Sequence, residues 1–163
     1  MSQFVIELLR KDHERASFRC GVEALDTFLA RYARQNAEAG ISRTFVAVAP
    51  PSLRVAGYYT LAASRVAFDN VPEATRKRLP RYPIPTLLLA RLAIDVTVKG
   101  GGLGGAMLHD AGKRALGLSG QVGIRLLEGE AKSDDARAFY ARHGALQLLD
   151  DADHLVFDLR LFR

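Results

Sequence analysis

The chain has 163 residues, of which 48% are hydrophobic and 25% charged, as in an ordinary globular protein. We therefore expect a single domain over residues 1–163. No apolar run approaches the roughly 20 residues that cross a membrane. The first residues also lack the basic start and apolar core of a signal peptide, so we expect a cytoplasmic protein that makes no membrane contact. The one cysteine, Cys20, excludes an intramolecular disulfide and a cysteine-based metal site.

The formal net charge is +5, and most of the cations are arginines, which suit bidentate phosphate contacts. A basic cluster, Arg76, Lys77 and Arg78, lies in a proline-rich segment. It is either a surface that receives a polyanion or an ordinary solvated basic face, and composition does not separate the two.

The spacing of apolar residues predicts the elements in chain order. A strand over 4–9 precedes a helix over about 22–40, a hairpin joins strands 44–49 and 55–63, and a short basic helix starts at Pro72. A buried strand over 86–94 is followed by a helix to Leu118, a strand over 123–127, a helix from Ser133 to Gly144 and a strand over 154–159. This order predicts an α/β (α+β) fold whose mixed central sheet of about six strands is flanked by helices.

The most informative segment is the glycine run that follows the buried strand. Five of the six residues from Gly100 to Gly105 are glycines, and an amphipathic helix begins at once. Glycines allow positive φ and close approach of the backbone, and the first helical turn offers free N–H groups and the positive end of a dipole. The sequence therefore predicts a cradle for the phosphates of an anionic cofactor.

Two common phosphate-binding motifs fit this segment poorly. Gly100, Gly102 and Gly105 satisfy the dinucleotide fingerprint, but too few strands follow for the usual six-stranded sheet. A Walker A motif is excluded because no Gly-Lys-Ser/Thr sequence is present at this loop.

The stretch Lys99-Gly100-Gly101-Gly102-Leu103-Gly104 resembles the cofactor motif of the GNAT superfamily of N-acetyltransferases. The resemblance implies the GNAT acyl-CoA N-acyltransferase fold and acetyl-CoA as cosubstrate. Loop amides would hold its pyrophosphate, and the strand backbone would pair with its pantetheine arm. Lys99 replaces the family's usual Gln or Arg, and Gly101 stands where relatives often carry Arg. The implied cofactor-binding residues are Leu92, Ala93, Ile94, Lys99, Gly100, Gly101, Gly102, Leu103, Gly104 and Gly105, together with Phe139.

The resemblance extends along most of the chain to the GNAT toxins of type II toxin–antitoxin modules. It rests on five segments in order: Phe18-x-Cys20-Gly21 with Leu25-Asp26-x-Phe28-Leu29, Gly40-Ile41-Ser42-Arg43-Thr44, Gly57-Tyr58-Tyr59-x-Leu61-Ala62, Arg91-Leu92-Ala93-Ile94-Asp95, and Ala138-Phe139-Tyr140-x-x-x-Gly144. Members of this family acetylate the amine of aminoacyl-tRNA and block translation. The implied partners are aminoacyl-tRNA and a ribbon-helix-helix antitoxin, with a homodimer left open.

Acetyl transfer requires a neutral amine and an acid for the departing thiolate. At pH 7 an α-amine costs only about 1 kcal/mol to deprotonate, whereas a lysine costs roughly 4 to 5, so a dedicated base is optional for α-amines. The candidate bases have simpler explanations. Glu128 and Glu130 are expected to be solvated at a strand end, His109 to face outward, and His143 to sit at a helix C-terminus.

Tyr140 is the candidate general acid, because the family's pattern places a tyrosine here that serves the CoA sulfur. Its neighbour Phe139 points about 100° away around the helix, so one ring can be core while the other faces a cleft. A tyrosine that only fills the core is the alternative.

Arg91 interrupts an apolar strand, either lining a substrate cleft or forming an ion pair with Asp95 or another acid. The predicted substrate-binding residues are Arg91 and the basic cluster. Cys20 is expected to be a buried structural thiol, and His109 with Asp110 lacks the further ligands of a metal site, so we expect no metal.

The sequence thus favours an acetyl-CoA-dependent acetyltransferase that modifies charged tRNA by direct transfer. Two alternatives stay open, namely a GNAT enzyme for a protein N-terminus or small-molecule amine, and a non-catalytic CoA-binding regulatory protein.

Overall fold

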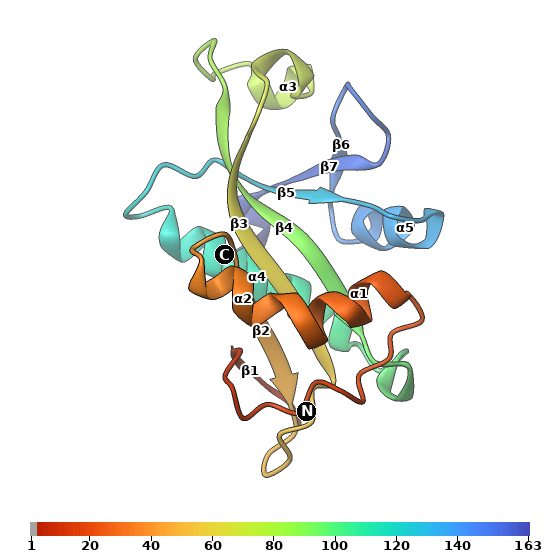
Figure 1. Ribbon diagram of the computed structural model, residues 1–163. Coiled ribbons are helices and arrows are strands. Elements are labelled where there is room, and N and C mark those ends of the chain that lie inside the picture. The colour runs from red at the N-terminus through yellow and green to blue at the C-terminus, as the bar shows by residue number, and fades with distance from the viewer. Residues whose placement is uncertain (1–2) are drawn as a thin grey trace. The chain divides into compact units, whose positions relative to one another are not determined.

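The structure is a computed structural model, which describes residues 3–163 of the chain (Figure 1). Its elements fall into two compact units, one formed by residues 3–62 and Ala90–Ala111, the other by Ala63–Leu89 and Gly112–Arg163. Strands β3 (Gly57–Val66) and β4 (Ile84–Ile94) and helix α4 (Leu103–Leu118) contribute to both units. Within residues 3–163, no helix combines the length and apolar character that crossing a bilayer demands.

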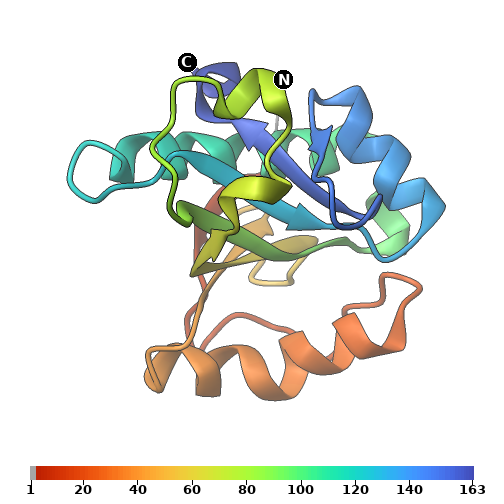
Figure 2. The same ribbon diagram turned by 90° about the horizontal axis from the view of Figure 1, so that it is seen from above.

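The first unit has the strand order β1-β2-β3-β4. Strand β1 (Val5–Leu8) pairs antiparallel with β2 (Arg43–Val48), which forms an antiparallel hairpin with β3. Three helical pieces connect β1 to β2: α1 (Glu23–Thr27), the π-helical segment η1 (Phe28–Tyr32) and α2 (Ala33–Glu38). They follow one another as one row, drawn in orange in Figure 2.

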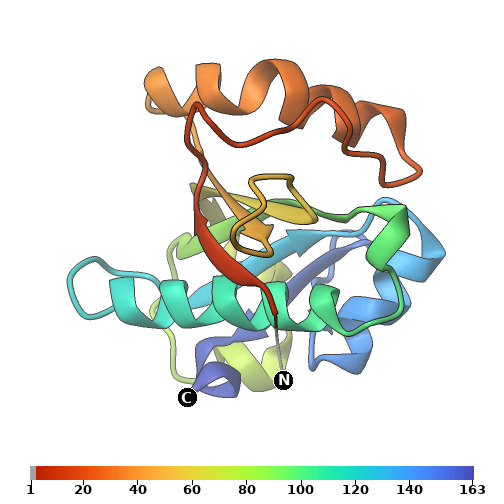
Figure 3. The same cartoon turned by 90° about the horizontal axis from the view of Figure 1, so that it is seen from below.

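The two faces of these strands are covered by different helices, as strand alternation requires. Tyr58 packs against Phe18 and Phe28 on the side of the α1–α2 row, with ring centroids 5.5 and 6.3 Å apart. The next residue, Tyr59, points the other way, and its hydroxyl donates to Asp110 in the first part of α4. Figure 3 shows the row and the start of α4 on opposite sides of the strands. Both tyrosines are fully buried.

The second unit has the strand order β3-β4-β5-β7-β6. Strand β5 (Leu126–Glu130) is parallel to β4 and antiparallel to β7 (His154–Asp158), which also pairs with β6 (Leu146–Gln147). The unit also contains α3 (Glu73–Arg76), α5 (Asp134–Arg142) and the 3-10 turns η2 (Phe68–Asn70) and η4 (Leu159–Phe162).

Most of the predicted order is confirmed, including the hairpin, the helix that follows the buried strand and ends at Leu118, and the helix ends at Gly40 and Gly144, which have positive φ. Three details were wrong. The predicted helix over 22–40 is interrupted by η1, the strand expected at 123–127 lies at Leu126–Glu130, and the described residues form seven strands because β6 was missed. Strand β5 begins later than predicted because its pairing with β4 starts only at Leu126, opposite Thr86. The single domain stays a prediction.

The close approach of α4 to η4 can be tested at two glycines of the same helix. A Cβ at Gly112 would lie 2.2 Å from a ring carbon of Phe162, whereas one at Gly117 would meet nothing within 4 Å. We expect Gly112→Ala to lower the free energy of unfolding by about 1–3 kcal/mol through overpacking. Gly117→Ala should raise it by about 0.5 kcal/mol, because alanine loses less backbone entropy in a helix. Urea denaturation measures both, and equal effects would contradict the packing.

Candidate functional site

The glycine run adopts the conformation that its composition predicts. After β4 ends at Ile94, the 3-10 turn η3 (Val96–Val98) leads to Gly100 and Gly102, whose φ angles are both 85°. A Cβ at either glycine would meet no atom within 4 Å, so backbone conformation rather than space favours glycine here.

The run ends at the N-terminus of the long helix α4, which begins at Leu103. The N–H of Ala106 donates to the carbonyl of Gly102 at 3.1 Å, which closes the first turn. The N–H groups earlier in that turn have no intrahelical acceptor, and the helix dipole is positive at this end. Loop and helix together therefore supply amides suited to an anion.

Strand β4 extends beyond its ladder with β5. The ladder pairs Thr86 with Leu126 and ends where Leu89 meets Gly129, whereas β4 continues to Ile94. A strand that outruns its neighbour presents backbone donors and acceptors on that edge, to which an extended polar ligand can add. The predicted pantetheine contacts, Leu92, Ala93 and Ile94, belong to this extension.

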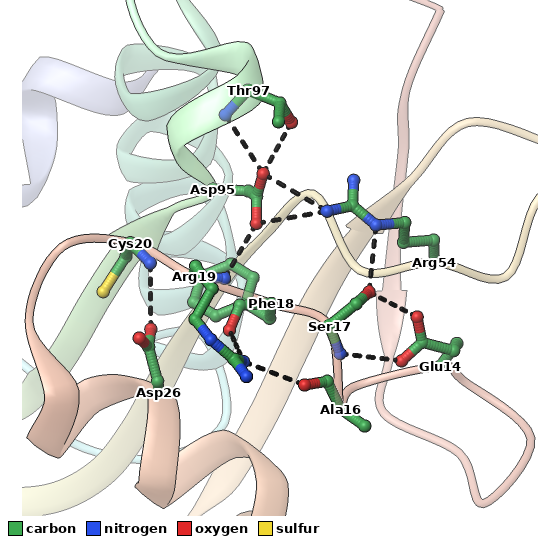
Figure 4. Close-up of polar contacts among 10 residues, drawn as sticks. All are labelled: Glu14, Ala16, Ser17, Phe18, Arg19, Cys20, Asp26, Arg54, Asp95 and Thr97. Carbon is green, nitrogen blue, oxygen red and sulfur yellow. Dashed lines mark hydrogen bonds and ion pairs between the residues drawn. The ribbon is translucent and has the colours of Figure 1, made fainter.

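Asp95 is the polar centre of the first unit (Figure 4). Its carboxylate is only 1% exposed and accepts from the Arg19 N–H at 2.8 Å, from the Thr97 N–H at 3.1 Å and from the Thr97 hydroxyl. The Arg54 guanidinium lies 3.5 Å away. Burial raises the pKa of Asp95, but the hydrogen bonds from Thr97 and Arg19 outweigh it, so the pKa lies below its usual value. The sequence analysis missed this role, although Asp-x-Thr is a local capping pattern.

The segment Glu14–Cys20, which we call the N-terminal strap, lies along the residues that lead to the glycine run (Figure 4). Arg54 donates to Ser17 at 3.0 Å, and the strap's Cys20 carbonyl accepts from Lys99 Nζ. The Lys99 side chain therefore contacts the strap. Its position in the cofactor motif did not predict this contact.

Cys20 is buried, as expected for a structural thiol. Burial, with a hydrogen bond to Asp26, raises the pKa of the Cys20 thiol to about 11, so it stays protonated at neutral pH. A protonated, buried thiol is a poor nucleophile, which supports direct transfer over an acetyl-cysteine route.

Arg91 does not pair with Asp95, the acid named first among its possible partners. Its guanidinium carbon lies 3.6 Å from the ring centroid of Phe28, and Asp95 faces Arg54 instead. A stacked guanidinium keeps its N–H edges available for further partners. Arg91 thus remains a candidate for substrate binding.

Tyr140 and Phe139 lie on α5, whose first turn is capped by the Ser133 hydroxyl accepting from the Ala136 N–H at 3.1 Å. Of the two rings Tyr140 is the buried one, 5% exposed and packed on Phe157. Burial raises the pKa of Tyr140 to about 12, so its hydroxyl stays protonated. A protonated hydroxyl can donate a hydrogen bond to a ligand.

Glu128 is not the solvated strand-end residue that the sequence analysis expected. It lies inside β5, 5% exposed, and accepts from the Thr86 hydroxyl at 2.7 Å. Its other oxygen lies 2.6 Å from Nε2 of His154, whose Nδ1 faces Asp150 at 3.0 Å. These donors make burial of the carboxylate tolerable.

The other candidate bases are where they were expected. His109 is exposed on α4, His143 is the exposed C-cap of α5, and Glu130 is exposed with Lys132 3.5 Å away. Within residues 3–163 no three His, Cys, Asp or Glu side chains form a group that could hold a metal ion.

One member of the basic cluster, Arg76, and the nearby Arg81 both lie over the ring of Phe68. The guanidinium carbons of Arg76 and Arg81 lie 5.7 and 5.6 Å from the ring centroid of Phe68, and Arg76 also donates to the Asp69 carbonyl. Phe68 packs in turn against the unit's apolar core. Lys77 and Arg78 are exposed, and none of these cations forms an ion pair in the described part of the chain.

The predicted site residues divide between the units. The first contains Arg91, the extension of β4 and the glycine run; the second contains the basic cluster, Phe139 and Tyr140. Each group is assembled within its own unit.

No family model matches the chain. It is similar to the tRNA-acetylating toxin of Mycobacterium tuberculosis, with 40% identity over 124 residues that make up 76% of this chain and 73% of that protein. A solved tyrosine-to-phenylalanine mutant of KacT is 31% identical, with a TM-score of 0.93 over 99% of this chain and 98% of that one.

Two structures of AtaT are also similar. AtaT complexed with acetyl-methionyl-tRNAfMet is 31% identical, with a TM-score of 0.91 over 96% of this chain and 95% of that one. A tyrosine-to-phenylalanine mutant of AtaT, bound to the C-terminus of the antitoxin AtaR and to acetyl-CoA, is 28% identical, with a TM-score of 0.83 over 99% and 96%.

The carboxylates around His154 predict a pH-dependent stability. Burial of the ring lowers the pKa of His154, but its hydrogen bonds to Asp150 and Glu128 raise it more, so the pKa is above 6.5 in the folded state. The resulting stabilisation is fully present below the unfolded pKa and is lost as pH rises through the folded one. We expect this loss in urea titrations of the wild type across neutral pH, and a flatter profile for His154→Gln. His143→Gln is the control; parallel profiles for wild type and His154→Gln would contradict the assignment.

Proposed function

The chain belongs to the GNAT-fold toxins that acetylate tRNA, and from this we propose that it transfers an acetyl group from acetyl-CoA to the α-amine of an aminoacyl-tRNA, blocking translation in the cytoplasm. The single observation that carries this proposal is the glycine run with two left-handed glycines between an extended strand and a 16-residue helix. The relatives supply the chemistry, since AtaT was solved with acetyl-CoA and with an acetylated tRNA.

The residues present fit acetyl-CoA. Its pyrophosphate needs several amides without bulky side chains around them, which the segment from Lys99 to Gly105 offers. Its pantetheine amides need a strand edge, which Leu92–Ile94 offer beyond the β4–β5 ladder. Phe139, half exposed beside Tyr140, offers an apolar contact. Acetyl-CoA supplies the activated acetyl thioester.

Tyr140 serves as the general acid in this proposal. The substrate nitrogen forms the new bond to the acetyl carbon and loses a proton, while the carbon–sulfur bond breaks and the sulfur gains a proton from the Tyr140 hydroxyl. The proton released by nitrogen restores the tyrosine, so the transfer is balanced. A pKa of about 12 keeps the hydroxyl protonated beforehand, so that it has a proton to donate.

The charged partner is bound through arginines. Arg76 of the basic cluster and the nearby Arg81 lie over one aromatic ring, and Lys77 and Arg78 beside them are exposed. This arrangement is suited to consecutive phosphates of an RNA backbone. Arg91 is proposed to contact the same substrate. A ribbon-helix-helix antitoxin is the proposed protein partner, because AtaT binds the C-terminus of its antitoxin, and a homodimer is a further proposal.

The decisive experiment compares charged and uncharged tRNA after incubation with the protein and acetyl-CoA. Mass spectrometry should find one added acetyl group on the aminoacyl moiety of charged tRNA and none on uncharged tRNA. Acetylation of free amino acids or peptides at an equal rate would replace this proposal by a general amine acetyltransferase.

Removing one hydroxyl tests the general acid. We expect Tyr140→Phe to lower kcat by about 10²- to 10⁴-fold, which corresponds to roughly 3 to 5 kcal/mol at the transition state. The affinity for acetyl-CoA and the melting temperature should change little, because the ring and its packing on Phe157 remain. Tyr32→Phe, at an exposed ring, is the matched control. A stable Tyr140→Phe protein with near-wild-type turnover would rule out the role.

Removing charge tests the RNA surface. Replacing Arg76, Lys77 and Arg78 by Gln should raise KM for aminoacyl-tRNA and reduce its salt dependence, by about 0.7 to 0.9 in the log–log slope per lost phosphate contact. The affinity for acetyl-CoA should not change. Replacing the exposed Lys11, Lys113 and Arg163 by Gln removes the same net charge elsewhere and is the control. Equal losses in both triple variants would show that net charge alone matters.

A further inference from the structure

We propose that Asp95 is a positioning residue for acetyl-CoA binding, because its carboxylate fixes the N-terminal strap against the residues that lead into the glycine run. This inference rests on the proposed function, since the ligand of the run is taken to be acetyl-CoA. It gives a role to the buried carboxylate of Asp95, which takes no part in the proposed acetyl transfer.

The carboxylate joins three segments that are remote in sequence (Figure 4). Oδ1 accepts from the Arg19 N–H, which is 76 residues away, and Oδ2 accepts from the N–H and hydroxyl of Thr97. The Arg54 guanidinium lies 3.5 Å from both oxygens and also donates to Ser17 of the strap. A carboxylate that is 1% exposed is stable only with such donors, so the arrangement is tightly specified.

Two more contacts extend this junction toward the glycines. The Val96 N–H donates to the Arg19 carbonyl at 2.8 Å, and Lys99 Nζ donates to the Cys20 carbonyl. The strap is therefore bonded to residues 95, 96 and 99, the last of which directly precedes Gly100. The start of the glycine run is held from the side, although its own glycines carry no side chains that could hold it.

This attachment matters for ligand binding because glycines lose the most conformational freedom when a loop becomes ordered. When the residue that precedes the run is fixed, the run presents its amides at a lower entropic cost as the anion binds. Loosening the junction should therefore weaken affinity for the phosphate-bearing part of acetyl-CoA. It should not slow the chemical step, because Asp95 touches no reacting atom in the proposed mechanism.

Asp158 provides a matched comparison within the same chain. Like Asp95 it caps a 3-10 turn, accepting from the Arg160 N–H at 2.9 Å, and it pairs with the Arg160 guanidinium at 2.7 Å. Its hydrogen bonds are local, so the same substitution there removes the ion pair with Arg160 and leaves the contacts of the strap unchanged.

The experiment compares Asp95→Asn and Asp158→Asn in the full chain. Calorimetric titration with acetyl-CoA should show about tenfold weaker binding for Asp95→Asn, about 1.4 kcal/mol, and no change for Asp158→Asn. KM for acetyl-CoA should rise with kcat and KM for aminoacyl-tRNA unchanged. Turnover of S-acetyl-pantetheine, which lacks the pyrophosphate, should be equal in both variants and the wild type. Arg54→Gln, at a partly exposed side chain outside the run, should weaken acetyl-CoA binding in the same direction and serves if Asp95→Asn does not fold.

Unchanged affinity for acetyl-CoA in a folded Asp95→Asn or Arg54→Gln protein would overturn the positioning role alone. An equal loss with S-acetyl-pantetheine would also overturn it, because a general structural defect does not distinguish the two donors. A wild-type protein that binds no acetyl-CoA would overturn the proposed function and this inference with it.

Discussion

Strand β4 is the element on which both units depend. It supplies Thr86 to the buried polar group of the second unit and Ala93 to the core of the first, and it ends one residue before Asp95. Its ladder with β5 ends at Leu89, so its remaining backbone can serve a ligand instead of a neighbouring strand. One strand thus stabilises the fold along part of its length and offers recognition groups along the rest.

Two buried carboxylates illustrate how polar groups specify this structure. Asp95 and Glu128 are 1% and 5% exposed, and each is surrounded by donors from distant parts of the chain. An unsatisfied buried carboxylate is strongly destabilising, so these contacts select one arrangement of the backbone over apolar alternatives. The contacts of Asp95 hold the residues that precede the glycine run. The contacts of Glu128 with Thr86 and His154 favour one register of β5 against β4 and β7.

Burial also shapes the proposed acid–base chemistry. The apolar surroundings raise the pKa values of both Tyr140 and Cys20, which keeps the one as a proton donor and the other as an inert thiol. An α-amine needs little help to lose its proton near neutral pH. In the proposed reaction an α-amine therefore makes little demand on a base, and Tyr140 supplies a hydroxyl that is protonated before the transfer.

Local sequence patterns were enough to predict most of the secondary structure. Periodicity and turn residues predicted most strands and helices, the ends at Gly40 and Gly144, and the glycine run before α4, because these depend on residues a few positions apart. The resemblance of the motif around Tyr140 to the family pattern identified the candidate acid. The partners of the charged side chains became evident only in the folded structure. Asp95 pairs with Arg54 instead of Arg91, Glu128 is buried, and Lys99 contacts the strap, because long-range contacts between segments leave no periodic trace in the sequence.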